Sequence, residues 1–233
     1  MSQQLFSLLF CFVEALISNI PGAVGRSLRN RYYRLRLAEM GSGVVIDCGV
    51  RIVNPGWVKI GANTWIDNYV VILAGKPNPN RGAFFRKAEL DGVREGEVRI
   101  GDNCHISPFV VLQGHGGLTI GSDSSVASGS KIYSLSHHYR NLADPTDRKI
   151  YKFSSMAPID EQSLISASVR VGRNTAIGLN SVLLPGTEIG EGAWISSGSV
   201  VMGRVEKNTV YGAPVKSILR EIDRSGATGN NIL

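Results

Sequence analysis

The chain has 233 residues and a net charge of +6; 27 residues are glycine, 43% are hydrophobic and only 7% are aromatic. This composition suits one elongated, glycine-rich domain with appendages and an aliphatic core. The positive charge would suit a membrane surface or a phosphorylated cofactor, whereas no basic–aromatic interleaving, zinc finger or helix-turn-helix pattern supports a nucleic-acid partner.

The cysteines indicate a reduced protein. Cys11, Cys48 and Cys104 are odd in number, lie far apart and form no C-x-x-C pair. We therefore expect a cytoplasmic location and neither a disulfide framework nor a cysteine zinc site.

Residues 1–40 are expected to form a helical cap or a membrane-facing segment. Residues 4–20 are strongly apolar, but they are too short to span a bilayer, contain Glu14 and lack the features of a secretory signal. An arginine-rich stretch follows: Arg26, Arg29, Arg31, Arg34 and Arg36. Such a segment can lie peripherally on an anionic membrane, here the inner membrane, or cover the end of a repeat domain, and the sequence leaves both open.

A six-residue period organises residues 41–211. Aliphatic side chains recur at every sixth position of one long run: Ile165, Val171, Ile177, Leu183, Ile189, Ile195 and Val201. Shorter runs with the same period begin at Ile46, Ile60, Ile100 and Ile120. Neither the period of an α-helix nor that of a single strand matches this spacing. It predicts an all-β solenoid, a parallel β-helix in which each unit supplies one short strand and one corner.

Two stretches, residues 76–98 and 136–162, break the period and are rich in charges and loop-forming residues. We expect them to be loops that leave the solenoid at its corners, because a coil that lengthens loses its stacking. Long loops on a rigid scaffold commonly carry function. Residues 212–233 are expected to form a tail with a short C-terminal helix.

The segment from Ile177 to Val201, followed by the Y-G-A-P-V-K run that ends at Lys216, resembles the hexapeptide-repeat acyltransferases. The resemblance covers most of residues 41–220 and is strongest to polysaccharide and sugar O-acetyltransferases. It implies a left-handed parallel β-helix, a homotrimer with active sites between subunits, acetyl-CoA as acyl donor and no metal. The left-handed coil is implied by the resemblance alone, since strand crossovers are normally right-handed.

In that family a catalytic histidine stands at the start of a corner excursion, and Ser136-His137-His138-Tyr139 occupies the equivalent place. The resemblance implies that His137 is the general base for an acceptor hydroxyl, with His138 as the alternative in register. An imidazole suits this task because it titrates near neutral pH. Several acids could orient the ring, and the sequence does not choose among them: Asp144, Asp147, Asp160 and Glu161.

The other two histidines are His105 and His115. Their spacing to His137 does not match the zinc ligands of β-helical carbonic anhydrases, so we expect no metal site. Surface or substrate-pocket roles are expected for both residues.

Cofactor contacts are implied by the same family, in which the pantetheine arm lies beside the last coils. The corresponding positions are Leu179, Ser197, Met202 and Gly203. A basic residue after the G-x-P motif contacts a CoA phosphate, and Lys216 holds that place. Many relatives have a Thr-Lys pair where this chain has Met202-Gly203, so Arg204 is a further candidate for this contact.

The expected function is acetyl-CoA-dependent O-acetylation of a sugar hydroxyl in the biosynthesis of a surface polysaccharide, namely capsule, O-antigen or exopolysaccharide. The acceptor would be a sugar or glycan, linked to a lipid or a nucleotide. Phe109 stands where sugar acetyltransferases carry a substrate-binding Asn, which argues against a simple galactoside-like acceptor. An amino-sugar N-acetyltransferase is the nearest alternative, and a non-catalytic scaffold or a γ-type carbonic anhydrase is a more distant one.

Overall fold

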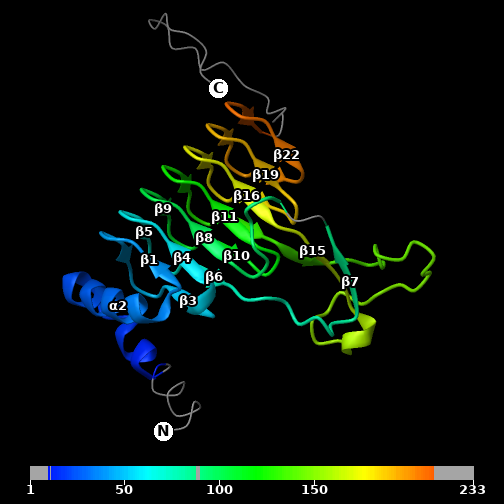
Figure 1. Ribbon diagram of the computed structural model, residues 1–233, viewed down its shortest axis with the longest axis horizontal. Coiled ribbons are helices and arrows are strands. Elements are labelled where there is room, and N and C mark those ends of the chain that lie inside the picture. Colours follow the sequence, from blue (N-terminus) through cyan, green and yellow to red (C-terminus); the bar gives the residue numbers. More distant parts are fainter. Residues whose placement is uncertain (1–9, 11, 88–89, 213–233) are drawn as a thin grey trace, which may run out of the picture.

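A computed structural model describes residue 10, residues 12–87 and residues 90–212. Short parallel strands form the three faces of a coil that rises along one axis, and a small side sheet projects from it (Figure 1). The expected C-terminal helix and Lys216 lie outside the described residues. The predicted parallel β-helix is confirmed over the described part of residues 41–211.

The three faces are sheets A, B and C. Sheet A contains β1 (Glu39–Met40), β4 (Val58–Ile60), β8 (Val98–Ile100), β11 (Leu118–Ile120), β16 (Val169–Val171), β19 (Glu188–Ile189) and β22 (Arg204–Val205). Sheet B contains β2 (Val45–Ile46), β5 (Trp65–Ile66), β9 (His105–Ile106), β12 (Ser125–Val126), β17 (Ala176–Ile177), β20 (Trp194–Ile195) and β23 (Val210–Tyr211). Sheet C contains β3 (Arg51–Val53), β6 (Val71–Leu73), β10 (Val111–Gln113), β13 (Lys131–Tyr133), β18 (Val182–Leu183) and β21 (Val200–Val201).

Aliphatic side chains of the strands point into the coil, one per strand on sheet C and two on the three-residue strands of sheet A, and they stack in register. On sheet C the stack runs through Ile52, Ile72, Leu112, Ile132, Leu183 and Val201, all of which are buried. Burying one such side chain contributes about 1.5–3 kcal/mol, so the repeated stack is the main source of stability. The aliphatic positions of the six-residue period are therefore the positions of the buried core residues.

Ile165 is an exception to the predicted run. It lies half-buried in β15 (Ser163–Ser166), outside the three faces, and the stack resumes with Val169 and Val171. The run also shortens at its far end, where Val205 on β22 follows Val201 after four residues. The coil there turns from sheet C to sheet A with fewer corner residues.

The two expected excursions pair with each other, a contact that the sequence did not predict. The first contains β7 (Ala83–Arg86), and the second begins with β14 (Leu135–His137), contains the 3₁₀ turn η2 (Ile159–Glu161) and ends with β15. β15 runs parallel to β7 and antiparallel to β14. Both excursions leave from the corner between sheets C and A, and pairing satisfies backbone groups that an extended loop would leave open. We call this corner the loop corner.

The N-terminal segment caps the first coil. Residues 12–17 are helical, and α2 (Gly22–Arg36) packs on β1, β2 and the 3₁₀ turn η1 (Pro55–Trp57). The Arg29 side chain is 1% exposed and donates hydrogen bonds to the carbonyls of Ile17, Ile20 and Ile46 at 2.8–3.0 Å. Arg26 forms an ion pair with Asp47 at 2.6 Å. Arg34 also donates to the carbonyls of Met40 at 3.4 Å and Gly41 at 3.3 Å, so three of the five arginines fasten the cap to the β-helix.

The apolar residues of this segment are only partly used by the cap. Phe12, Leu16, Val24 and Leu35 are each at least 59% exposed. In the described part of the chain no helix is both long and apolar enough to cross a membrane. These contacts favour the capping prediction, and the membrane-surface prediction stays open beside it.

Replacing Arg29 by methionine should destabilise the cap. Each buried carbonyl left without a donor costs about 1–3 kcal/mol, so the loss of three donors should lower the free energy of unfolding by about 3 kcal/mol or more. Urea unfolding at one protein concentration measures this change. Arg31→Met is the matched control, because Arg31 is exposed on the same helix, and its effect should stay within about 0.5 kcal/mol. Equal effects of both variants would contradict the anchoring role of Arg29.

Candidate functional site

His137 stands where the second excursion leaves the loop corner. The excursion closes at its base, where the Ala167 N–H donates to the Ser134 carbonyl at 2.9 Å. His137 is the last residue of β14 and pairs with Leu164 of β15. Its side chain is half-buried. The side sheet thus holds the histidine at a fixed place just off the β-helix.

Gln162 is the polar partner of His137. Its side-chain Oε1 lies 3.4 Å from His137 Nε2, and the residue is 1% exposed. The Gln162 Nε2 donates to the carbonyls of Ala157 at 2.6 Å and Ser155 at 3.3 Å, which fixes the orientation of the amide. The oxygen facing His137 can only accept, so His137 Nε2 carries a proton. In the neutral ring the lone pair is then on Nδ1.

A cation completes this arrangement. The Arg81 guanidinium donates to the same Gln162 Oε1 at 3.3 Å. Arg81 thus helps to hold the Gln162 amide with its oxygen towards His137, and this orientation defines the tautomer of the neutral ring.

None of the four acids suggested from the sequence contacts His137 in the described structure. Asp144 caps its own turn through Thr146, and Glu161 forms an ion pair with Lys152. The Asp147 carboxylate accepts from Tyr151 Oη at 2.6 Å, and this hydrogen bond is the main reason that its pKa is lowered. Asp160 contributes only its backbone carbonyl, to Lys149. The expectation of an acidic partner was wrong for these residues, because an uncharged amide fills the position.

The remaining histidines differ in their surroundings. His138 Nδ1 lies 2.9 Å from the Arg140 carbonyl oxygen and 3.1 Å from the Arg140 nitrogen, within its own turn. His115 Nδ1 lies 2.8 Å from the Gly75 carbonyl, so it donates there and leaves Nε2 free at the loop corner. His105 lies on the outer face of sheet B, 3.5 Å from the Asp67 carboxylate. His115 is therefore a second imidazole on the same corner as His137.

The described residues that the resemblance implies for the cofactor fall on two corners. Met202 and Gly203, followed by Arg204, lie at the loop corner, where β21 of sheet C gives way to β22 of sheet A. This is two strands above β13, or about 10 Å at the usual strand spacing. Leu179 and Ser197 lie instead at the corner between sheets B and C, joined by a 3.1 Å hydrogen bond from the Leu179 N–H to Ser197 Oγ. One chain therefore places only the first group beside His137.

The corner between sheets B and C also carries two exposed aromatic rings, and we call it the aromatic corner. Tyr69 and Phe109 stack with ring centroids 5.5 Å apart, and both have positive φ, 59° and 62°. Side chains of this size rarely adopt that conformation. Phe109, expected near an acceptor, therefore lies on a different corner from His137.

Lys87 is a candidate that sequence reasoning missed. A Cβ built at Gly186 would lie 3.3 Å from Lys87 Nζ, so this cation covers the Gly186 turn of the loop corner, between the coils of His137 and Met202. Lys87 belongs to the first excursion, which lies outside the six-residue repeat, so the sequence pattern could not predict its position next to Gly186. Among residues 10, 12–87 and 90–212, no group of three His, Cys, Asp or Glu side chains could hold a metal ion.

The tautomer of His137 can be measured directly. Ring ¹⁵N shifts at alkaline pH should show the Nε2–H form in the wild type, because Gln162 accepts that proton. Gln162→Met removes the acceptor and should abolish this preference at His137. His138 is the internal control, since its hydrogen bond to Arg140 does not involve Gln162. A dominant Nδ1–H form of His137 in the wild type would contradict the assignment.

No family model matches the chain. Among curated proteins, it is 33% identical over 132 residues to WbbJ of Escherichia coli K12, provisionally named a lipopolysaccharide biosynthesis O-acetyl transferase; the match covers 55% of this chain and 63% of that protein. It is 28% identical over 185 residues to a dTDP-4-amino-4,6-dideoxy-D-glucose acyltransferase of Escherichia coli, covering 75% and 82%.

A solved structure shares the fold. AntD, an N-acyltransferase from Bacillus cereus in complex with dTDP and 3-hydroxybutyryl-CoA, superimposes with a TM-score of 0.62 at 19% identity, over 79% of this chain and 83% of that one. This likeness supports the expected left-handed parallel β-helix. The chain is thus similar in sequence to proteins named as sugar O-acetyl and acyl transferases, in agreement with the resemblance read from the hexads.

Proposed function

We propose that the protein is an acetyl-CoA-dependent O-acetyltransferase that acetylates a sugar hydroxyl in surface polysaccharide biosynthesis. The observation that carries the proposal is the His137 imidazole, held through Nε2 by Gln162 where the second excursion leaves the loop corner. The relatives named for lipopolysaccharide O-acetyl transfer and for acylation of a nucleotide-linked sugar support the substrate class. The reaction would take place in the cytoplasm.

The proposed reaction uses His137 as general base. Its Nδ1 accepts the hydroxyl proton as the sugar oxygen attacks the thioester carbonyl of acetyl-CoA. Backbone N–H groups would stabilise the tetrahedral oxyanion. The intermediate expels the CoA thiolate, which takes the proton back from the imidazolium. The products are an acetyl ester and CoA thiol, and the histidine returns to its starting form.

Amino-sugar N-acetylation is the second candidate. One relative is named for acylation of an amino sugar, and AntD is named an N-acyltransferase. The same base would remove a proton from an attacking amine, so the site geometry suits both reactions. Parallel assays with hydroxyl and amino acceptors distinguish them.

A homotrimer would complete the cofactor groove. The outer face of sheet A carries charges that pair along the strands, such as Lys59 with Glu39 and Arg170 with Glu188. Sheets B and C and the aromatic corner instead expose large apolar side chains: Trp65, Tyr69, Phe109, Leu179, Trp194, Val200 and Val210. A neighbouring copy seated on these faces would bury them and bring its Leu179 and Ser197 to the loop corner of the first copy. Closed cyclic symmetry provides such a neighbour.

Peripheral membrane contact is proposed for the cap. The exposed side chains Phe12, Leu16, Val24 and Leu35 lie on the helices that cover the first coil. Exposed arginines, including Arg31, add electrostatic attraction to anionic lipids. This placement would suit a lipid-linked acceptor.

His137→Ala should abolish acetyl transfer while leaving the fold and CoA binding intact. Loss of a general base costs about 100- to 10,000-fold in rate. The assay combines acetyl-CoA with a panel of nucleotide sugars and glycans and measures thiol release. Controls are His138→Ala, which shares the turn, and His115→Ala, which shares the loop corner. An inactive His115 variant beside an active His137 variant would move the base to His115 and contradict the assignment.

The trimer can be tested by light scattering at micromolar concentration, where the wild type should have three times the monomer mass. Trp194→Glu places a charge on the apolar face of sheet B and should release monomers. Thr119→Glu is the matched control on the charged face of sheet A and should leave the trimer intact. A monomeric wild type, or dissociation caused only by the sheet A variant, would contradict this assembly.

A further inference from the structure

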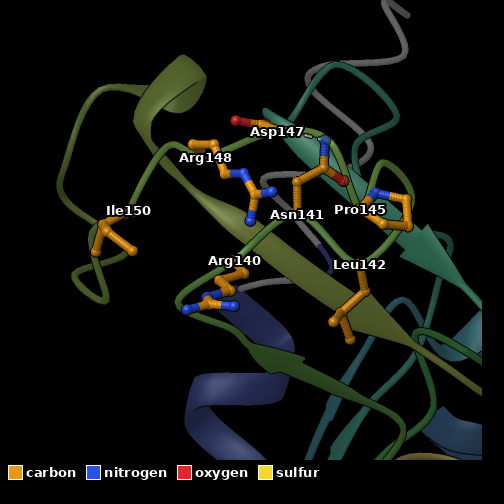
Figure 2. A pocket seen from close by; sticks show the side chains of 7 residues that line it. All are labelled: Arg140, Asn141, Leu142, Pro145, Asp147, Arg148 and Ile150. Atoms are coloured by element: carbon orange, nitrogen blue, oxygen red, sulfur yellow. Dashed lines mark hydrogen bonds between the residues drawn. The ribbon is translucent and has the colours of Figure 1, made fainter.

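The turn after His137 encloses a pocket of about 250 Å³ (Figure 2). Its lining is partly basic and partly apolar: Arg140, Asn141, Leu142, Pro145, Arg148 and Ile150. In Figure 2 the Arg148 side chain reaches across the pocket towards Asn141, and Leu142 and Ile150 lie on opposite sides. The pocket belongs to the excursion and not to the repeated coils.

Both guanidinium groups of this pocket carry uncompensated charge. Within the described part of the chain, neither Arg140 nor Arg148 forms an ion pair. The Arg140 guanidinium carbon lies 5.3 Å from the Tyr139 ring centroid, a contact that orients the group and leaves its in-plane N–H donors free. Two arginines without acidic partners favour an anionic ligand with several oxygens.

The one carboxylate that lines the pocket, Asp147, is hydrogen-bonded to residues of its own loop. Asp147 accepts from Tyr151 Oη at 2.6 Å, from the Lys149 N–H at 2.8 Å and from Asn141 Nδ2 at 3.3 Å. These bonds hold its pKa below the usual range, with the Tyr151 hydrogen bond as the largest cause. Asp147 therefore shapes the pocket wall and does not neutralise the arginines through a direct contact.

The pocket is tied to the strand pair that carries His137. Ser163 Oγ donates to the Arg140 carbonyl at 2.7 Å, and the His138 N–H donates to the Ser163 carbonyl at 2.9 Å. Ser163 begins β15, the partner of β14. An acceptor held at Arg140 is thus close in sequence and in structure to the proposed base, three residues away.

We propose that Arg140 and Arg148 bind the diphosphate group of the acceptor, so that its sugar reaches His137. This inference rests on the proposed function, since it names the class of acceptor as a diphosphate-linked sugar. Two guanidinium groups match two phosphoryl groups, and Arg is suited to bidentate phosphate contacts. Leu142, Pro145 and Ile150 offer an apolar wall to the group beyond the diphosphate, which is either a nucleoside or a polyprenyl chain.

Calorimetric binding at low salt tests the pocket without turnover. The probes are inorganic diphosphate, a nucleoside diphosphate and a polyprenyl diphosphate in detergent micelles. Arg140→Gln and Arg148→Gln should each weaken the binding of every diphosphate that the wild type binds by at least about tenfold, because each loses a hydrogen bond to a charged group. Lys207→Gln is the control; it removes an exposed cation at the far corner of the last coil and should change nothing. The affinity ranking of the three probes identifies the source of the diphosphate.

Two outcomes would overturn the pocket assignment. One is a wild type that binds none of the three probes yet releases thiol with neutral glycans, which would leave the proposed acetyl transfer standing. The other is diphosphate binding that survives both arginine substitutions, which would place the anion site elsewhere. Conversely, binding that both substitutions weaken, together with no thiol release on any acceptor, would support the pocket and overturn the proposed reaction.

Discussion

Axial stacking of the inward-facing aliphatic side chains is the interaction on which the rest of the structure depends. The stack through Ile52, Ile72, Leu112 and Ile132 requires the coils to stay in register, so extra residues can enter only at corners. Both long excursions obey this constraint and leave from the same corner. That shared origin allows β7 to pair with β15, which fixes the side sheet on which His137 stands. The packed core thus determines where His137 lies, although no core side chain belongs to the candidate site.

The polar site is built on a neutral amide. Gln162 accepts a hydrogen bond from the His137 Nε2–H and adds no charge. Arg81 is bonded to the same oxygen. The result is an imidazole with a defined tautomer, followed by a loop in which Arg140 and Arg148 form no ion pair within the described residues. If His137 is the base and this loop holds the acceptor, as proposed, acceptor binding and proton transfer are geometrically coupled.

The coils could be predicted from the sequence because each core position repeats at a fixed spacing. Ile165 matched that spacing by coincidence, since β15 has its own alternation within the side sheet. The pairing of the two excursions could not be predicted, because it joins segments with no shared period, and Lys87 at the Gly186 turn was missed for the same reason. His137 could be singled out from the sequence because it stands at the histidine position of a known motif. Gln162 could not be singled out, because the search for a partner of His137 considered acidic residues, such as the neighbouring Glu161, and not uncharged amides.

The residues expected to contact the cofactor lie on two corners, so the proposed function depends on assembly of several copies. Met202 and Gly203 share the loop corner with His137, while Leu179 and Ser197 would need a neighbouring copy to reach it. The most direct test is a crystal structure of the protein with CoA. The account predicts that the thiol lies within hydrogen-bonding reach of the His137 imidazole, in a groove between the loop corner of one subunit and the aromatic corner of the next. A CoA thiol bound away from His137, or a complete site within one chain, would contradict it.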